Sequence, residues 1–262
     1  MKNRSGQKGF TIIELLTGMT LLVIMVLFLT RIFTDASSMW RLGNKRVESS
    51  FDGRAAIDFM SREIGSTIAD DVLSFRMFSD VTNLHNGVSA DFIAFITADH
   101  NPLTAAGHAN RHRQVKQVIY WVDLMRRIDE TGAVIPNRYR IRRSEVLSQD
   151  ALSFICYRNK QWWDRSSNSG AWLSADIIAE NVRTLEFLVY DQNGVSQFNY
   201  NSEIHGPPAW VDIVVELLGE EDAIRIAQMP AGPVATEMAD RAARRYFQRV
   251  YLSNNPGYVF AK

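Results

Sequence analysis

An uninterrupted apolar segment near the N-terminus constrains this chain more than any other feature of its sequence. Sixteen uncharged residues follow one another from Leu15 to Thr30, and the apolar run itself begins at Phe10. The 21 residues from Phe10 to Thr30 would form a helix about 31 Å long, which is enough to cross the hydrocarbon core of a bilayer. The segment therefore predicts a membrane-spanning helix.

Glu14 is the only charged residue inside this apolar run. A carboxylate in hydrocarbon costs roughly 2.5 kcal/mol or more, so we expect it to have a partner. A cut between Gly9 and Phe10 would create an α-amino group one helical turn away from Glu14. That amine would be able to neutralise the carboxylate of its own subunit or of a neighbouring one.

The residues around this junction, Lys8-Gly9-Phe10-Thr11-Ile12-Ile13-Glu14, closely resemble the type IV prepilin signal. The resemblance implies that a dedicated prepilin peptidase cuts after Gly9 and methylates the new amine of Phe10. It also implies that Glu14, the fifth residue of the mature chain, serves filament assembly. Three basic residues match the leader of such signals: Lys2, Arg4 and Lys8.

Two other interpretations of the N-terminus stay open. A basic leader with a Leu-rich core also describes an ordinary secretory signal, and Ala36-Ser37-Ser38 offers small residues for a later cut. A glutamate is poorly tolerated inside the apolar region of such a signal. The second alternative is a plain signal anchor with an accidental Gly-Phe pair.

Composition limits what the rest of the chain can do. Removing nine leader residues from the 262 leaves 253, with 26 basic and 29 acidic side chains and a net charge of −3. This balance argues against a general polyanion binder. Cys156 is the only cysteine, so an intramolecular disulfide is excluded. Many type IV pilins close a C-terminal loop with a disulfide, and this chain departs from that pattern; we expect Cys156 to be a buried strand residue.

The region after the membrane segment has the periodicity of an amphipathic helix. No proline occurs before Pro102, so the helix can continue, although Gly43-Asn44 predicts a break or a new cap. Apolar residues recur at steps of three and four, and charged residues occupy the other positions. The apolar set is Ile57, Met60, Ile64 and Ile68, with Val47 and Phe51 upstream.

Beyond about residue 70 the pattern changes to the two-residue period of strands. Six strands are predicted, at 90–96, 117–122, 138–142, 152–158, 185–190 and 211–217, followed by a helix at 233–248 and a strand at 249–252. The fold class is therefore α+β: a long N-terminal helix, half membrane and half amphipathic, packed on a mostly antiparallel sheet domain, as in pilins and pseudopilins. The predicted parts are a leader (1–9), a membrane and filament-core helix (10–33), an amphipathic helix (34–70) and a periplasmic β-rich domain (71–262).

Three segments carry a finer resemblance, namely 51–69, 177–194 and 208–215. They are similar to J-type minor pseudopilins of type II secretion. The chain also resembles a second prepilin-type family, called Verru_Chthon cassette protein C. That family usually has a Trp after the Asp-x-x-Gly turn, whereas here Phe198 is the nearest aromatic residue.

The resemblance implies a non-catalytic minor subunit of a type II pseudopilus tip, held in the bacterial inner membrane with its globular domain in the periplasm. The implied partners are other minor and major pseudopilins, the prepilin peptidase and the cytoplasmic membrane. A type IV pilus minor pilin for adhesion or DNA uptake is the first alternative. A membrane-anchored periplasmic enzyme is the second.

Other constellations give weaker functional signals. His108 and His112 are spaced for one helix face, but their Pro- and Gly-containing surroundings favour a solvated loop over a metal site. Trp162 and Trp163 are a possible subunit interface, with packing of their loop on the sheet as the alternative. No catalytic, phosphate-loop or calcium-loop pattern stands out, so no cofactor or metal is expected.

The middle third of the chain is basic, with interleaved aromatic residues, as in some nucleic-acid grooves. Acidic residues interrupt the run, so a solvated or subunit-facing strand surface is favoured over nucleic-acid binding. The basic residues are Arg111, Arg113, Lys116, Arg126, Arg127, Arg138, Arg140, Arg142 and Arg143.

Overall fold

In a computed structural model of the protein, the described residues are 11–68, 75–79, 89–98, 115–128, 134–147, 175–230 and 232–252. Their contacts divide the chain into two compact units, Met1–Glu48 and Ser49–Lys262. The first unit holds the larger part of the N-terminal helix. The second unit holds the end of that helix and every described strand.

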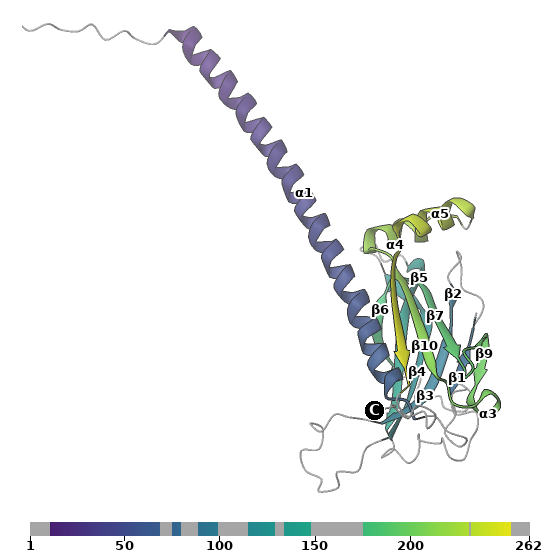
Figure 1. The fold of residues 1–262 in the computed structure, drawn as a ribbon. Helices are drawn as coiled ribbons and strands as arrows, with labels where there is room; N and C mark the ends of the chain where they lie inside the picture. The colour runs from purple at the N-terminus through teal and green to yellow at the C-terminus, as the bar shows by residue number, and fades with distance from the viewer. Residues whose placement is uncertain are drawn as a thin grey trace, which may run out of the picture. The chain divides into compact units, whose positions relative to one another are not determined.

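The N-terminal helix α1 (Ile12–Gly65) is continuous over 54 residues (Figure 1). It passes through Gly43 and Asn44, where the sequence predicted a break; a single glycine costs only about 1 kcal/mol in a helix, too little to end it without a proline. α1 stops five residues before the predicted boundary at residue 70. There the Ser66 N–H bonds to the carbonyl oxygens of Arg62 and Glu63, and Thr67 forms a bridge with Thr97.

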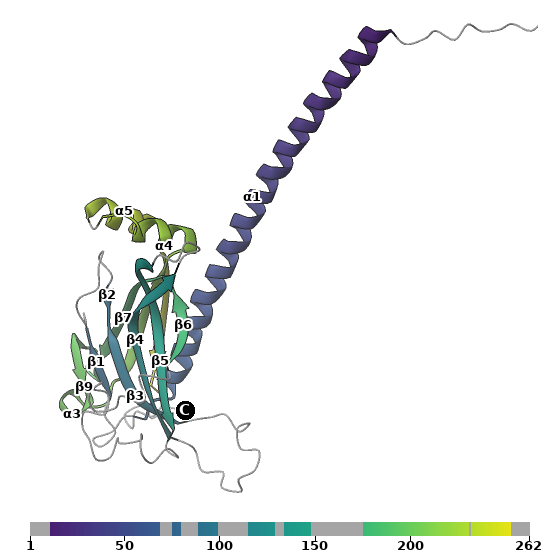
Figure 2. The same cartoon turned by 180° about the vertical axis from the view of Figure 1, so that it is seen from behind.

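Six strands form the first sheet, in the order β6-β5-β4-β3-β1-β9, and all neighbours are antiparallel. Figure 2 shows this sheet with its long strands β4 and β5 in view. The strands are β1 (Arg76–Phe78), β3 (Phe92–Ala98), β4 (Val115–Ile128), β5 (Val134–Leu147), β6 (Asp176–Glu180) and β9 (Asn199–Asn201).

The second sheet has the order β11-β10-β7-β2, with β8 paired to β7. Only the β2–β7 pair is parallel among its described pairs. The strands are β2 (Ser89–Ala90), β7 (Val182–Tyr190), β8 (Ser196–Gln197), β10 (Trp210–Leu217) and β11 (Arg244–Tyr251). Helices α4 (Glu220–Ala227) and α5 (Pro233–Ala242) lie at one end of the sheets, and α3 (Ser202–His205) lies at the other (Figures 1 and 2).

At two of the points where the chain crosses between the two sheets, the crossing residue is polar. Asp91 separates β2 from β3: its N–H bonds to the Leu185 carbonyl (2.8 Å), and its carboxylate accepts the Phe187 N–H (2.7 Å). Asn181 separates β6 from β7 with a positive φ of 59°, and its side-chain oxygen accepts two hydrogen bonds from Arg138. The predicted strand 90–96 is therefore divided at Asp91.

Side chains from both sheets and from the end of α1 share one apolar core. Ile57, Met60 and Ile64 are buried, which confirms the predicted apolar face, and the end of α1 lies beside β6 (Figures 1 and 2). Phe51 was assigned to the same face, but it is 69% exposed. The core confirms the predicted α+β class with mostly antiparallel sheets. The predicted strand 152–158 and Cys156 lie outside the described residues.

The C-terminal part of the chain departs from the sequence prediction. The predicted helix 233–248 ends at Ala242, and the chain then enters β11 at Arg244. β11 pairs with β10 along its whole length, from Arg244 opposite Leu217 to Tyr251 opposite Trp210. This cross-strand pairing outweighs the helical preference of the local sequence, because strand preference is mainly a matter of tertiary packing.

We predict that Gly53→Ala destabilises the globular unit. A Cβ at Gly53 would lie 2.3 Å from Cε2 of Tyr246 on β11, so the ring or the helix must move. We expect the free energy of unfolding to fall by about 1–2 kcal/mol, even though alanine favours the helix by about 1 kcal/mol. Urea denaturation of a soluble chain beginning at Lys45 would measure this.

The control for this prediction is the same substitution made together with Tyr246→Leu. With the ring gone, Gly53→Ala should be neutral or stabilising, and the two changes should be strongly non-additive. An equal effect of Gly53→Ala in both backgrounds would show that the Tyr246 ring does not set the requirement for glycine.

Candidate functional site: the N-terminal helix and a buried carboxylate

The described start of α1 contains a reciprocal pair of hydrogen-bonding side chains. Thr11 precedes the first helical residue, and its hydroxyl oxygen accepts the Glu14 N–H at 3.3 Å. In return, Glu14 Oε2 accepts the Thr11 N–H at 3.3 Å and the Thr11 hydroxyl at 3.2 Å. This is a capping box, which satisfies backbone donors that a helix start would otherwise leave unpaired. It turns the Glu14 carboxylate back toward the N-terminal end of the helix.

This geometry leaves Glu14 able to accept one more donor. Its Oε1 receives no hydrogen bond from the described residues, and the side chain is exposed. A negative charge in the first turn is also favoured by the helix dipole. Gly9 and Phe10, the predicted cleavage and methylation residues, lie outside the described residues, so both assignments stay predictions.

The helix that follows is apolar and uncovered. The 30 residues Ile12–Arg41 are long and apolar enough to cross a membrane, and none of that stretch is buried within the chain. Its hydroxyl groups are satisfied inside the helix: Thr17, Thr20 and Thr30 donate to the carbonyl oxygens four residues earlier at 2.5–2.8 Å. Because a lipid interior offers no hydrogen-bond partners, this internal pairing makes the segment compatible with hydrocarbon.

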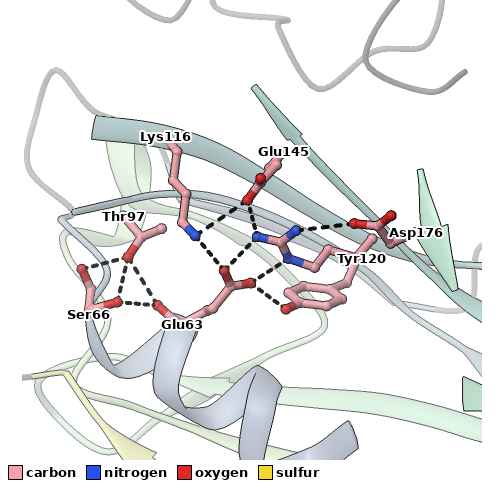
Figure 3. A network of polar contacts seen from close by, with 8 residues as sticks. Glu63, Ser66, Thr97, Lys116, Tyr120, Glu145 and Asp176 are labelled. Atoms are coloured by element: carbon pink, nitrogen blue, oxygen red, sulfur yellow. Dashed lines mark hydrogen bonds and ion pairs between the residues drawn. The ribbon is translucent and has the colours of Figure 1, made fainter. Parts of the chain in front are cut away.

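A second polar centre lies where the last turn of α1 meets the first sheet (Figure 3). Glu63 Oε2 accepts hydrogen bonds from Arg143 Nε at 2.8 Å and from the Tyr120 hydroxyl at 2.5 Å. Glu63 Oε1 lies 2.6 Å from Arg143 Nη2 and 2.8 Å from Lys116 Nζ. Arg143 Nη2 also contacts Glu145. The helix end is thereby bonded to β4 and β5 through one carboxylate.

Hydroxyl groups at the same helix end form hydrogen bonds with β3. Thr97 Oγ1 lies 2.9 Å from the Ser66 carbonyl oxygen and 2.6 Å from Ser66 Oγ. Thr97 is fully buried. Figure 3 shows this hydroxyl pair next to the carboxylate centre, so one turn of helix is fixed to three neighbouring strands.

The surroundings of Glu63 and Arg143 favour the charged form of both side chains at neutral pH. Burial alone would raise the pKa of Glu63, but the hydrogen bonds and charge of Arg143, with the bonds from Lys116 and Tyr120, lower it below its ordinary value of 4.5. Burial and the charge of Glu63 raise the pKa of Tyr120 well above 10.0. Burial opposes the charge of Arg143, but bonding to Glu63 raises its pKa. Glu63 has both oxygens engaged, so it is occupied as a structural ion and is unavailable as a general base.

Sequence reasoning placed Glu63 on the polar face of the amphipathic helix and missed this centre. A usable signal existed, because Glu63 directly precedes the buried Ile64 and lies three residues after the buried Met60. Its partner Arg143 lies 80 residues further along the chain. Only the sheet register brings that partner to the helix.

The predicted basic surface of β4 and β5 is largely paired within the domain. Arg143 is bound by Glu63, and the buried Arg138 donates to Asn181. Arg140 and Arg142 lie 3.4 Å and 3.8 Å from the Asp123 carboxylate. The expectation of a solvated strand face is therefore wrong for the buried Arg138 and Arg143, whereas the alternative of a subunit-facing surface stays a prediction.

Several predicted site residues cannot be placed. Trp162, Trp163, His108 and His112 lie outside the described residues. Within the residues that the structure describes, no group of three or more His, Cys, Asp or Glu side chains is arranged to hold a metal ion.

Comparison with known proteins gives one match, and it falls on the apolar helix. Residues 4–30 match the family model described as the prokaryotic N-terminal methylation motif. This segment contains Gly9, Phe10, the Thr11–Glu14 capping box and the core of the apolar run. No curated protein and no solved structure matches the chain.

We predict that Glu63→Gln lowers the free energy of unfolding of the globular unit by about 3 kcal/mol at pH 7, because it removes the buried carboxylate that Arg143 and Lys116 share and leaves them only the more exposed carboxylates of Glu145 and Asp176. The folded pKa of Glu63 is lowered, so its contribution is complete above about pH 4.5 and is lost as pH falls through the folded pKa. The difference between wild type and variant should therefore shrink below that pH. Urea denaturation from pH 7 to pH 3 measures both effects.

Asp212→Asn is the matched control. Asp212 and Arg249 also form a two-bond pair, at 2.6 Å and 2.7 Å, but Arg249 is 43% exposed. Asp212 is itself buried, but water can hydrate the exposed Arg249 when its partner is lost, so the loss should be smaller than for Glu63→Gln. Equal losses from the two variants, or a difference for Glu63→Gln that is independent of pH, would contradict the special role of the Glu63 centre.

Proposed function

We propose that this chain, which is a type IV prepilin-like protein, is a minor pseudopilin that helps to form the tip of a type II secretion pseudopilus and has no catalytic role. The observation that supports the proposal is the uncovered apolar helix headed by the Thr11–Glu14 pair inside the matched methylation motif. A chain with such a helix needs lipid or other helices around it. A filament made of such subunits supplies the second environment.

The first state in this proposal is a membrane precursor. Lys2, Arg4 and Lys8 keep the leader on the cytoplasmic side of the inner membrane, since basic residues flanking a membrane helix favour that side. The globular unit is then periplasmic. A prepilin peptidase cuts between Gly9 and Phe10 and methylates Phe10.

The second state is the filament subunit. The new amine of Phe10 directly precedes Thr11, and the capping box already turns the Glu14 carboxylate toward that end of the helix, with Oε1 available. The pair formed by this amine and Glu14, within one subunit or between neighbours, removes the cost of an isolated carboxylate among apolar helices. Glu14 thereby favours the assembled state over a subunit alone in lipid.

Two alternatives come from different functional classes. A type IV pilus minor pilin for adhesion or DNA uptake shares the same N-terminal machinery. The pairing of Arg143 with Glu63, and of Arg140 and Arg142 with the shared Asp123 carboxylate, weakens the DNA-uptake variant, since it leaves less unpaired positive charge on this strand face. A membrane-anchored periplasmic enzyme would need a catalytic group that Glu63, with both oxygens bonded, does not provide.

Trp162 and Trp163 remain proposed contacts with other minor subunits.

We predict that the native protein begins Phe-Thr-Ile-Ile-Glu after processing, with a mass 14 Da above that of the unmodified N-terminal peptide because the Phe10 amine is methylated. N-terminal sequencing and mass spectrometry of the membrane fraction measure this. Gly9→Leu should leave the leader attached, since cleavage depends on the small residue at the junction. A native chain starting near Met39 would instead establish ordinary secretion and overturn the proposal.

We predict that Glu14→Leu keeps membrane insertion, because it removes an insertion cost on the order of 2.5 kcal/mol, and blocks incorporation into the filament. Co-purification with neighbouring prepilin-like subunits, with secretion as the second readout, measures the effect. Thr17→Val is the matched control: the Thr17 hydroxyl is bonded to the Ile13 carbonyl within the same helix, so its loss should be tolerated. Normal incorporation of Glu14→Leu would remove the proposed role of this carboxylate.

A further inference from the structure

One face of the second sheet points away from the core and carries a row of three aromatic rings. The core takes every second residue of β10, beginning at Val211, so the alternate residues of β10 and of its neighbours face outward. Trp210 lies directly across from Tyr190 of β7 and from Tyr251 of β11. The ring centroids are 4.9 Å apart for Tyr190 and Trp210, and 6.4 Å apart for Trp210 and Tyr251.

The next row across the same face is polar. Asp212 of β10 accepts two hydrogen bonds from Arg249 of β11, at 2.6 Å and 2.7 Å. Cζ of Arg249 also lies 5.6 Å from the centroid of the Trp210 ring and 6.0 Å from that of Tyr190, which is the range of a cation–π contact. We call Tyr190, Trp210, Tyr251, Asp212 and Arg249 the aromatic face.

The turn that follows β7 holds the indole ring of this face in place. A Cβ at Gly194, where φ is 76°, would lie 3.4 Å from Cη2 of Trp210, so the turn packs on the ring. Asp191 fixes the turn, because its side-chain oxygen accepts the N–H groups of Asn193 and Val195, both at 2.9 Å. A surface whose side chains are already fixed loses little conformational entropy when it binds a ligand.

The aromatic face is open to solvent. Tyr251 is 61% exposed, and the neighbouring outward residues Leu188 and Phe247 are 40% and 57% exposed. Among the described helices none lies across β7 and β10 in Figure 1; α4 and α5 lie at one end of these strands and α3 at the other. Adjacent exposed apolar and aromatic groups of this kind are typical of a binding surface.

The size of this face favours a narrow ligand. β10 has eight residues, and three neighbouring strands of that length present a flat area of roughly 27 Å by 14 Å. This is about 400 Å², half of the roughly 800 Å² that each partner buries in a stable protein interface. A single extended chain covers such a strip, and sheet faces of other β folds bind oligosaccharides.

The charge of this face disfavours an anionic ligand. Arg249 is bonded to Asp212, and Arg245 lies 3.9 Å from Glu216. With Glu186, which also faces outward opposite β10, the outward side chains have a net charge of 2 − 3 = −1. An uncharged ligand with apolar C–H surfaces and hydroxyl groups matches this face. Its C–H surfaces stack on the aromatic rings, and its hydroxyl groups bond to tyrosine hydroxyls and to the further N–H donors of Arg249.

We propose that the aromatic face binds a neutral, β-1,4-linked polysaccharide, with successive pyranose rings along the aromatic row and their hydroxyl groups on Arg249. Asp212 positions the guanidinium group. A β-1,4 linkage gives an extended, flat chain that suits a flat sheet, whereas an α-1,4 linkage coils the chain away from it. This inference goes beyond the proposed function, because it concerns the globular unit alone and does not require a place in a filament.

Isothermal titration calorimetry of the purified full-length protein tests this, in a zwitterionic detergent because a sugar head group would compete. The probes are cellohexaose and the β-1,4-linked hexamer of N-acetylglucosamine, with the α-1,4-linked maltohexaose as the comparison. We expect at least one β-linked hexamer to bind about tenfold more tightly than maltohexaose. A preference between the two β-linked probes distinguishes a plain glucan from an amino-sugar polysaccharide, and either supports the proposal. Binding of no hexamer, or equal binding of maltohexaose, overturns it.

Substitutions locate the site. Tyr251→Ala removes an exposed ring without opening the core, and it should weaken binding by about tenfold, the size of one lost stacking contact. Tyr251→Trp should keep the binding. Trp121→Ala is the matched control, because Trp121 also has an arginine, Arg142, 6.0 Å from its ring centroid but lies on the first sheet. It should leave binding unchanged. Equal weakening by the two alanine variants, or none by Tyr251→Ala, overturns the assignment.

The remaining outcomes separate this inference from the proposed function. If no hexamer binds and Tyr251→Ala instead abolishes co-purification with prepilin-like subunits, the face is a protein interface. The polysaccharide inference then fails and the proposed function stands. If a β-linked hexamer binds through Tyr251 while wild type co-purifies with no prepilin-like subunit, the inference stands and the proposed function fails.

Discussion

The apolar surface of α1 that the chain cannot cover by itself is the constraint on which the rest of this structure depends. Ile12–Arg41 has no buried residue, so this stretch requires a solvent other than water. Its threonine hydroxyls are bonded within the helix, which lets it enter hydrocarbon at little polar cost. Glu14 is the exception, since its carboxylate accepts hydrogen bonds only from Thr11 among the described residues. Under the proposed function, the amine of a processed chain would supply the further partner.

The globular unit solves a different problem, which is how to hold the end of a long helix in one place. The buried Glu63 is bonded by Arg143, Lys116 and Tyr120, and each of these donors comes from β4 or β5. Apolar packing of Ile57, Met60 and Ile64 supplies contact area, but it is not directional and so allows small rotations and translations of the helix. A carboxylate held by four donor contacts restricts both of these movements of the helix. Burying Glu63 and Arg143 costs desolvation free energy, and in this fold the buried pair fixes the position of the helix end.

The two ends of α1 therefore use charge in opposite ways. Glu63 is fully paired within the chain and keeps its ionised form, because its pKa is lowered by the surrounding donors. Among the described residues only one of the two Glu14 oxygens accepts a hydrogen bond, so the other is available to a further donor. Two glycines of the same helix also differ. Gly53 lies against the Tyr246 ring, whereas a Cβ at Gly43 would meet nothing within 4 Å.

The sequence by itself determined the long apolar helix, the apolar face of Ile57, Met60 and Ile64, and the strand character of β4, β7 and β10, because each of these is a local pattern in the sequence. It did not locate the strand start at Arg244, the sheet changes at Asp91 and Asn181, or the Glu63–Arg143 centre. These depend on contacts between residues that lie 27 to 96 positions apart, such as Leu217 with Arg244 and Phe187 with Asp91. Only the tertiary structure decides such contacts, because sheet register and strand pairing choose each residue's partner, and the local sequence carries no record of that choice.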